Sequence, residues 1–370
     1  MLLTILFGCL AGCQRQKETA VTEDRMLIGV CAYDTSYTEM QMFMNYYRDY
    51  ISQGLSVDFL FSESLHSGEE EQEFIRLAKK QGAEGIISFY GQDLADTLKV
   101  CADERIYYVL GSGSISDSDF DAVKDNEWFL GVIGPDTEEE YQAGYEMAAS
   151  FLQQDASSWL ILSGGASIGN HMHSTRVEGM QAALGANADV TICSGYLSTE
   201  EGRKNLEEAL SQKKYDAVLA AMSLGDSLDY ICEALGNGKD SPLIGIVDCF
   251  SEENLEAMRE GKLNYVAGKY GSLAGPAVAA VYNAATGHVD VVREEGEPFR
   301  LQQKLWKADS AETYEELYGF TQGIYENAYS CDELMQVIAV FEPETGYEDF
   351  AALTQASDVE SVEKRILDRE

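Results

Sequence analysis

Polar and aromatic side chains follow the apolar runs of this sequence, at positions where side chains are free to bind a small molecule. Tyrosine rings offer flat faces, and serine, carboxylate and arginine groups form hydrogen bonds with hydroxyls. This combination is typical of sites that recognise sugars, which present apolar C–H faces and a ring of hydroxyl groups. The candidate ligand-binding residues are Tyr33, Asp34, Tyr37, Tyr90, Ser112, His171, His173, Arg176, Ser223, Asp248 and Lys269.

Several of these candidates also have a structural explanation. The chain contains 21 tyrosines, so a tyrosine at a strand end is about as often a packing residue as a binding one. His171 and His173 could begin a metal site, but the sequence shows no third ligand, no CxxC and no HExxH. A solvated loop or hydrogen bonds to the ligand explain the histidine pair better, and we predict no metal and no cofactor. Lys269 could instead pair with a carboxylate.

The elements that must position these residues are indicated by short apolar runs that alternate with amphipathic stretches. Residues 69–82 and 137–154 are expected helices, with acidic residues in their first turns. The expected strands are residues 27–33, 57–61, 85–90, 106–111, 128–133, 159–164, 190–195, 216–222, 243–248 and 264–270.

This alternation predicts an α/β protein with two doubly wound parallel-sheet lobes. Ligands bind beyond the carboxyl ends of the strands in such sheets, which is why the residues after the strands are the candidates. Neither half has a GxGxxG motif after its first strand, and the chain has neither Gly-x-Ser-x-Gly nor a credible catalytic triad. An enzyme of similar architecture is therefore a poor candidate.

Length and composition agree with a folded protein of about two domains, since the chain has 370 residues and is 45% hydrophobic. The charge is unusual: 26 Lys and Arg stand against 64 Asp and Glu, and 26 − 64 = −38. A surface this negative repels nucleic acid and favours a soluble monomer.

The first 13 residues form an apolar run that is too short to span a bilayer, as in a secretion signal. Its end, residues 10–13 (LAGC), resembles the bacterial lipobox, in which the cysteine is acylated. We therefore predict a signal peptide over 1–13, lipidation of Cys13 and a polar tether over 14–25. Export signals normally have a Lys or Arg before the apolar run, and this sequence has none there. An accidental apolar N-terminus is therefore the alternative.

Beyond this segment, six cysteines remain in or beside apolar runs. They are Cys31, Cys101, Cys193, Cys232, Cys249 and Cys331. Widely spaced cysteines in a large core need no disulfide framework, so we interpret them as small buried side chains.

Four segments between residues 26 and about 310 together resemble the type 1 periplasmic binding proteins, the sugar-binding receptors of ABC importers, in their lipoprotein form. The first is a strand, a polar aromatic loop and a helix, and the second is a crossover into a second lobe. The third is a glycine-rich loop with Arg-x-x-Gly, and the fourth carries polar residues to the ligand. The segments are LIGVCAYDTSYTEMQMFMNYYRDY, FLGVIGPDTEEEYQAGYEMAASFL, WLILSGGASIGNHMHSTRVEGMQAAL, and the pair YDAVLAAMSLGDSLDYICEALG and SPLIGIVDCFSEENLEAMREGKLNYVAGKYGSLAG.

The resemblance implies a non-enzymatic receptor, anchored outside the bacterial cell by lipid on Cys13, which delivers a sugar or related polar solute to an ABC transporter permease. A sensor that signals to a membrane kinase or chemoreceptor is the alternative. The resemblance also implies three segments that cross between the lobes, expected near 131–135, 248–269 and 292–300. The expected divisions are 26–130 plus 269–300 for lobe one, 131–268 plus 301–319 for lobe two, and 320–370 for a C-terminal helical extension.

Arg176 and Asp248 fall on positions that this family uses for ligand contacts, so we expect both to face the cleft. Ser223 stands where the family has asparagine and Lys269 where it has glutamine, and paired histidines enter the glycine-rich loop. These extra positive groups predict a cleft that opposes the net charge of the chain and suits an anionic solute.

The resemblance fades after residue 319, where two or three helix-like pieces follow. Cys331, Leu334, Met335, Ile338 and Phe341 recur at helical spacing. This apolar face is expected to pack on a lobe, although it could also face a partner.

Overall fold

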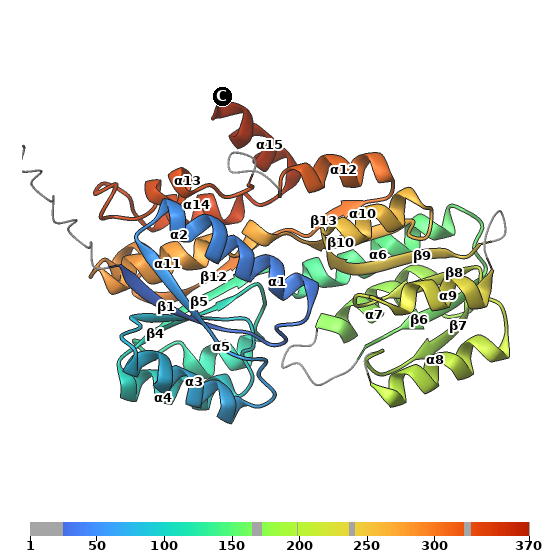
Figure 1. Cartoon of the computed structure of the whole chain (residues 1–370), viewed down its shortest axis with the longest axis horizontal. Helices are drawn as coiled ribbons and strands as arrows, with labels where there is room; N and C mark the ends of the chain where they lie inside the picture. The colour runs from blue at the N-terminus through green and yellow to red at the C-terminus, as the bar shows by residue number, and fades with distance from the viewer. Residues whose placement is uncertain (1–24, 165–171, 198, 237–240, 322–326, 370) are drawn as a thin grey trace, which may run out of the picture.

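The structure is a computed structural model that describes residues 25–164, 172–197, 199–236, 241–321 and 327–369. Two sheets lie side by side with helices on their faces, and the C-terminal helices run along one side of the molecule (Figure 1). The predicted lipidation of Cys13 and the predicted tether concern residues outside those that the structure describes. Among those described, no helix is both long and apolar enough to cross a membrane.

The first sheet has seven strands in the order β11-β12-β5-β4-β3-β1-β2. All neighbours pair in parallel except β11 and β12. The strands are β1 (Met26–Cys31), β2 (Val57–Phe61), β3 (Gly85–Ser88), β4 (Tyr107–Gly111), β5 (Phe129–Gly134), β11 (Arg293–Glu294) and β12 (Glu297–Gln302).

The second sheet has six strands in the order β13-β10-β9-β8-β6-β7, and only β13 is antiparallel. Its strands are β6 (Ser158–Leu162), β7 (Asp189–Cys193), β8 (Ala217–Ala220), β9 (Leu243–Cys249), β10 (Tyr265–Lys269) and β13 (Trp306–Ala308). The strands β3, β5 and β8 are buried along their whole length, as expected for strands covered on both faces.

All ten strands expected from the sequence are present, and the α/β fold class with two mostly parallel sheets is confirmed. The strands β11, β12 and β13 were not predicted. Residues 293–294 and 306–308 are too short to show a hydrophobic period, and 297–302 do not alternate strictly, since Pro298 and Phe299 are both buried.

Helices begin where side chains can accept the free backbone N–H groups of the first turn. Ser67 caps α3 and Asp136 caps α6 in this way. The helices are α1 (Thr38–Asn45), α2 (Ser52–Gly54), α3 (Gly68–Lys80), α4 (Leu94–Glu104), α5 (Asp117–Val123), α6 (Thr137–Leu152), α7 (Met172–Leu184), α8 (Glu200–Gln212), α9 (Ser227–Leu235), α10 (Glu252–Arg259), α11 (Gly275–Ala285), α12 (Ala311–Gly319), α13 (Cys331–Gln336), α14 (Tyr347–Gln355) and α15 (Val359–Asp368), with a π-helical turn η1 (Tyr46–Ile51) and 3₁₀ turns η2 (Gly271–Ala274) and η3 (Val289–Val292).

Helices α6 and α7 pack closely because a glycine on each helix meets the backbone of the other. A Cβ placed on Gly144 would lie 2.0 Å from the carbonyl oxygen of Arg176, and one on Gly179 would lie 2.1 Å from that of Tyr141. These contacts leave no room for a side chain. They also fix the position of the α7 segment that faces the cavity described below.

We expect Gly179→Val to lower the free energy of unfolding by about 3 kcal/mol, because the valine side chain must push the α6 backbone away. Chemical denaturation measures the effect. Gly319→Ala is the matched control, since a Cβ there meets nothing within 4 Å and should change stability by less than about 0.5 kcal/mol. Equal midpoints for the two variants would contradict the close helix contact.

The chain crosses between the two sheets three times. It leaves β5 for α6, which packs on β8, β9 and β10; it leaves β10 for α11, which packs on β3, β4 and β5; and it leaves β12 for β13. The crossings are therefore residues 135–136, 270–274 and 303–305. The second and third come later than expected, because β10 and β12 each stay in their own sheet to Lys269 and Gln302.

The C-terminal extension packs on the second and third crossings. Ser357 is fully buried; its Oγ accepts a hydrogen bond from the backbone N–H of Lys304 at 2.8 Å. Its carbonyl oxygen accepts from Trp306 Nε1 at 2.9 Å and from the Tyr270 hydroxyl at 3.1 Å. Gln303 Nε2 donates to the Leu273 carbonyl at 2.9 Å, which joins the two crossings directly.

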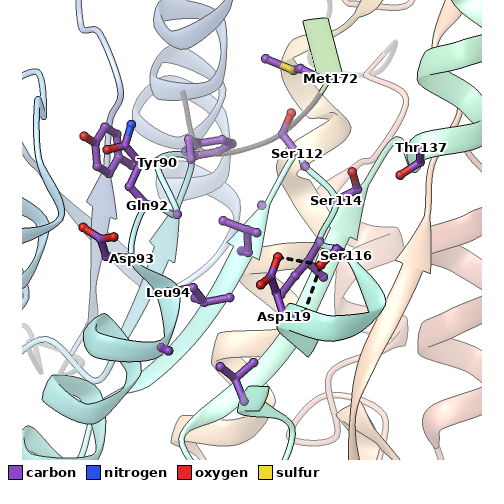
Figure 2. Close-up of a pocket in the computed structure, with 18 of the residues that line it drawn as sticks. Tyr90, Gln92, Asp93, Leu94, Ser112, Ser114, Ser116, Asp119, Thr137 and Met172 are labelled. Carbon is purple, nitrogen blue, oxygen red and sulfur yellow. Dashed lines mark hydrogen bonds between the residues drawn. The ribbon is translucent and has the colours of Figure 1, made fainter. Parts of the chain in front are cut away.

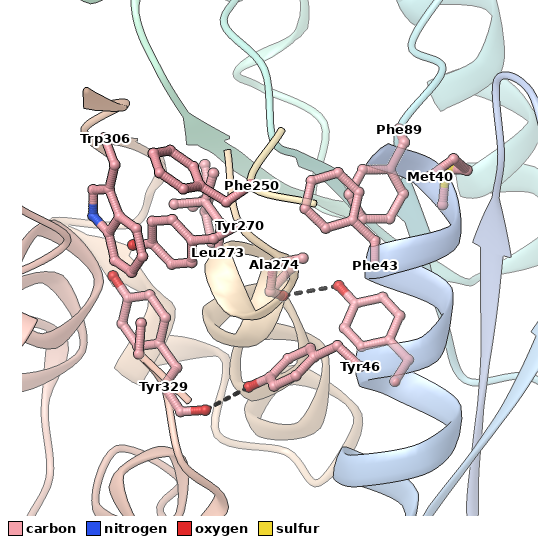
Figure 3. Close-up of a cluster of buried hydrophobic side chains, with 14 of the residues drawn as sticks. Met40, Phe43, Tyr46, Phe89, Phe250, Tyr270, Leu273, Ala274, Trp306 and Tyr329 are labelled. Atoms are coloured by element: carbon pink, nitrogen blue, oxygen red, sulfur yellow. Dashed lines mark hydrogen bonds between the residues drawn. The ribbon is translucent and has the colours of Figure 1, made fainter. Parts of the chain in front are cut away.

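An aromatic cluster surrounds these contacts (Figure 3). The rings of Tyr270 and Trp306 stack with centroids 3.8 Å apart, and the carbonyl of Tyr329 accepts from the Tyr46 hydroxyl at 2.8 Å. The prediction that the extension packs on the body of the protein is confirmed for Cys331, Leu334 and Ile338, which are buried, whereas Phe341 is exposed. All six cysteines that the structure describes are free and buried, as expected.

Candidate ligand-binding site

A cavity of about 440 Å³ lies between the carboxyl ends of the two sheets. Loops after β1, β3 and β4 line one side, and loops after β7 and β8, the start of α7 and the ends of β9 and β10 line the other. We call it the central cavity. Nine of the candidate residues line it: Tyr33, Asp34, Tyr37, Tyr90, Ser112, His173, Arg176, Asp248 and Lys269.

Two further cavities share walls with the central cavity. One, of about 620 Å³, shares Tyr90 and Ser112 and is rich in serine; we call it the serine cavity (Figure 2). The other, of about 460 Å³, shares Tyr37 and Tyr196, and contains the candidate Ser223. Ser223 lines this neighbouring cavity together with Tyr37, so this candidate lies beside the central cavity without lining it.

The loop after β1 brings two tyrosines and an acid to the cavity wall. The rings of Tyr33 and Tyr37 meet edge to face with centroids 6.0 Å apart. The hydroxyl of Tyr33 donates to Glu39 Oε1 at 3.1 Å. Burial, followed by the charge of Glu39, raises the pKa of Tyr33 well above its usual value, so the hydroxyl keeps its proton.

Lys269 pairs with a carboxylate, which was the structural alternative for this residue. Its Nζ lies 3.4 Å from Glu39 Oε1 and 3.1 Å from the carbonyl oxygen of Ser112. Lys269 is 4% exposed. Ser112 has a φ of 58°, which is uncommon for a residue other than glycine, and this conformation directs its carbonyl to the lysine.

Arg176 also has a buried carboxylate partner. Its Nε and Nη2 donate to Glu140 at 2.5 and 3.0 Å, and Nη1 donates to the carbonyl of Ala221 at 2.7 Å. Both charged side chains are less than 5% exposed. Arg176 lines the cavity as expected, but the pair with Glu140 neutralises its charge.

The prediction that extra positive groups make the cleft suit an anion gains no support from Arg176 and Lys269, and His171 lies outside the described residues. The two cations of the central cavity in the described part of the chain are each held by an acid, Arg176 by Glu140 and Lys269 by Glu39. The sequence could not show these pairs, because their members lie 36 and 230 positions apart. The cleft keeps the negative sign of the whole chain.

Asp248, at the end of β9, faces the central cavity and is 8% exposed. Its Oδ2 accepts from Asn254 Nδ2 at 3.0 Å, whereas Oδ1 has no hydrogen-bond partner among the residues described. Burial raises the pKa of Asp248 to about 6, and the hydrogen bond from Asn254 opposes the shift. At neutral pH this residue is a buried carboxylate with one free oxygen.

Two buried hydroxyls on the opposite wall also lack partners in the described structure. They are the Oγ of Ser112 and the hydroxyl of Tyr90, on residues that are 8% and 6% exposed. Buried polar atoms are normally satisfied, so these atoms and Asp248 Oδ1 are available to a polar ligand.

The histidine pair is only half described. The ring of His173 lies edge to face with that of Tyr196, with centroids 5.7 Å apart, at the cavity wall. His171 lies outside the described residues. Within the described ranges, no group of three or more His, Cys, Asp or Glu side chains could hold a metal ion.

Several residues of the site were missed from the sequence, among them Glu39, Glu140 and Tyr196. Tyr196 follows the strand β7 and could have been found by the rule used for the other candidates. Glu140 is in the first turn of α6, where acidic residues were interpreted as helix-dipole partners, and Glu39, in the first turn of α1, was not singled out.

A buried acid supports the loop that carries Tyr90. Glu71 is fully buried, and its Oε1 accepts from Ser88 Oγ at 2.5 Å and from the Tyr108 hydroxyl at 3.0 Å. Ser88 Oγ in turn accepts from the backbone N–H groups of Tyr90 and Gly91. Burial raises the pKa of Glu71 to about 7.

Because its pKa is raised in the folded state, Glu71 contributes stability that is fully present below about pH 4.5 and is lost as the pH rises through 7. The resulting fall in the free energy of unfolding between pH 4.5 and 8 should be up to about 3 kcal/mol in the wild-type protein, and Glu71→Gln should abolish it. Urea denaturation at several pH values measures it. Parallel pH profiles for the two proteins would contradict a buried, titrating Glu71.

Solved structures share the fold of this chain at low sequence identity. A solute-binding protein of an ABC transporter from Bacillus halodurans C-125 with bound myo-inositol is 19% identical, with a TM-score of 0.61 over 80% of this chain and 99% of its own. The binding protein of the arabinose ABC transporter from Shewanella sp. ANA-3, bound to L-arabinofuranose, is 20% identical, with a TM-score of 0.61 over 80% and 96%. A periplasmic solute-binding protein from Actinobacillus succinogenes 130z with bound D-allose is 12% identical, with a TM-score of 0.63 over 79% and 100%.

No curated protein sequence matches this chain. The model of the periplasmic binding protein domain, however, matches residues 32–288, which include both sheets' central strands and every described candidate residue. The prediction of a binding protein, not an enzyme, is confirmed by this match. The chain belongs to the periplasmic binding protein family.

Proposed function

We propose that this chain is an extracytoplasmic receptor that captures a sugar-like or small polar ligand between its two lobes and delivers it to the permease of an ABC transporter. The observation that carries the proposal is the central cavity, where tyrosine rings from one sheet face Asp248 from the other. The matched structures with bound myo-inositol, arabinofuranose and allose support a ligand of this chemical class.

Recognition follows from the chemistry of the cavity wall. Tyr33 and Tyr37 offer apolar faces for the C–H groups of a sugar ring, while Asp248 Oδ1, Ser112 Oγ and the Tyr90 hydroxyl can take part in hydrogen bonds with its hydroxyls. These groups come from both lobes. A ligand that bridges them stabilises the closed arrangement, because only a difference in affinity between two states shifts their populations.

A thermal-shift screen over sugars, polyols, sugar acids and nucleosides tests the proposal. A ligand at 100 times its Kd should stabilise the protein by about 2.7 kcal/mol and raise Tm for one chemical class. Tyr37→Ala should abolish the shift, whereas Tyr145→Ala, on the 40%-exposed face of α6, should leave it intact. A screen in which no small polar solute raises Tm would overturn the proposal.

We also propose the lipid anchor on Cys13, which rests on the sequence of residues 10–13. Expression in a bacterium with labelled palmitate should label the wild-type chain and leave it in the membrane fraction. Cys13→Ser should remain unlabelled and appear in the soluble extracytoplasmic fraction, while Cys101→Ser, at a buried core position, should remain anchored. Equal labelling of wild type and Cys13→Ser would disprove the anchor.

A further inference from the structure

We propose that the ligand carries a protonated amine, as an amino sugar does, and that Asp248 binds this ammonium group. The inference rests on the proposed function and specifies the chemical class within it. Its basis is the balance of charged groups around the central cavity, taken together with one buried carboxylate oxygen that has no partner in the described structure.

The first step is that neither cation of the central cavity is available to the ligand. The guanidinium of Arg176 is held by both oxygens of Glu140 and by a backbone carbonyl. Lys269 donates to Glu39 and to the carbonyl of Ser112. An anionic ligand would have to compete with these buried carboxylates for the same donors, and a buried charge that loses its partner is strongly destabilised.

The second step is that Asp248 has no such partner. No Lys or Arg of the described chain lies within ion-pair distance of it, and the groups that form hydrogen bonds with it, first among them the amide of Asn254, are neutral. The carboxylate of Glu39 adds a further negative charge near Asp248, and its repulsion raises the pKa of Asp248 further. A buried carboxylate without a cation is costly, and a ligand ammonium would relieve that cost.

The third step is that the adjoining serine cavity is also acidic. Asp93, Asp96, Asp119 and Glu140 line it, and its described lining contains no Lys, Arg or His. Figure 2 shows Asp93 and Asp119 on this wall, with Asp119 hydrogen-bonded to Ser116. Asp96 pairs outward with Lys99, and Glu140 with Arg176, so the remaining charge comes from Asp93 and Asp119. A cleft with walls of one sign concentrates ions of the opposite sign.

The aromatic residues of the central cavity are also suited to bind an ammonium group. Tyr37 is close enough to Asp248 that the carboxylate, after burial, is the largest cause of its raised pKa. Its ring and that of Tyr33 can contact both the C–H face of a sugar and a cation. A neutral sugar would use these rings and the hydroxyls, but it would leave the charge of Asp248 unbalanced.

Isothermal titration calorimetry with matched compounds tests the inference. Each of glucosamine, galactosamine and mannosamine is compared with its parent hexose, its N-acetyl derivative and its uronic acid. For the hexose that fits, the amine should bind at least about tenfold more tightly than the parent, because a charge-assisted hydrogen bond replaces a neutral one. N-acetylation should remove this preference, and the uronic acid should bind more weakly than the parent.

The variant Asp248→Asn should lose the preference for the amine while still binding the neutral hexose. Asp189→Asn, which changes an exposed acid at the start of β7, at the opposite end of the strand from the cavity, is the control and should keep the preference. If Asp248→Asn fails to fold, the comparison of the four compounds on the wild-type protein still decides. Equal or tighter binding of the neutral parent, or of the uronic acid, would overturn the inference and leave the proposed function standing. The absence of binding by every sugar, polyol and amine would overturn both.

Discussion

Replacing Arg176 with methionine should lower the free energy of unfolding by about 3–5 kcal/mol, because it leaves Glu140 as an uncompensated buried charge. The substitution also removes the hydrogen bond to the carbonyl of Ala221 at the end of β8. Denaturation in urea measures the loss. An unchanged midpoint would contradict the buried ion pair. Arg176 would then be available to contact the ligand.

The double variant Arg176→Met with Glu140→Leu provides the sharper test. Removing both charges should restore most of the stability, because apolar side chains of similar size often replace a buried ion pair without loss. The matched surface control is the pair of Lys213 and Asp189, whose side chains are 31% and 65% exposed. Lys213→Met should cost less than about 1 kcal/mol.

Replacing Tyr329 with alanine should lower the free energy of unfolding by about 3–5 kcal/mol, as for other large buried aromatic side chains. The Tyr329 hydroxyl donates to the carbonyl of Thr354 at 2.7 Å, and the guanidinium carbon of Arg365 lies 5.1 Å from the centre of its ring. The loss should therefore detach the C-terminal helices from the crossings that they contact, and chemical denaturation together with proteolysis measures both effects.

Phe341→Ala is the control for this prediction, since Phe341 lies in the same extension but is 45% exposed. We expect a change of no more than about 1 kcal/mol there, from its contact with the ring of Tyr282. If Tyr329→Ala and Phe341→Ala had the same small effect, the extension would not be an integral part of the folded core.

These experiments also bear on the proposed ligand capture, because the extension contacts two of the three crossings that would act as hinges if the lobes close on the ligand. Ser357 forms hydrogen bonds with Lys304, Trp306 and Tyr270, which lie at or beside these two crossings. The matched structures cover about four fifths of this chain but nearly all of their own length. About a fifth of this chain therefore has no counterpart in them.

The sequence alone determined the strands and the edge at which the ligand site lies. Each of the ten expected strands is a local apolar run, and the carboxyl ends of parallel strands share one edge, so Tyr33, Tyr90 and Asp248 could be identified without a structure. The short strands β11 and β13 could not be identified in this way. They have two and three residues, too few for a hydrophobic pattern, and they become strands by pairing with a neighbouring strand in the folded chain.

Only the tertiary structure decided the electrostatic character of the site. The sequence shows Arg176 and Lys269 as cations at strand and helix ends, but the partners Glu140 and Glu39 come from other elements and could be any of 64 acids. The net charge of a buried site depends on which charged groups lie within a few ångströms of one another, and only the folded chain sets these distances. The same dependence leaves Asp248 as an acid without a cation in the described chain, which is the basis for proposing a cationic ligand in place of the anionic one expected from the sequence.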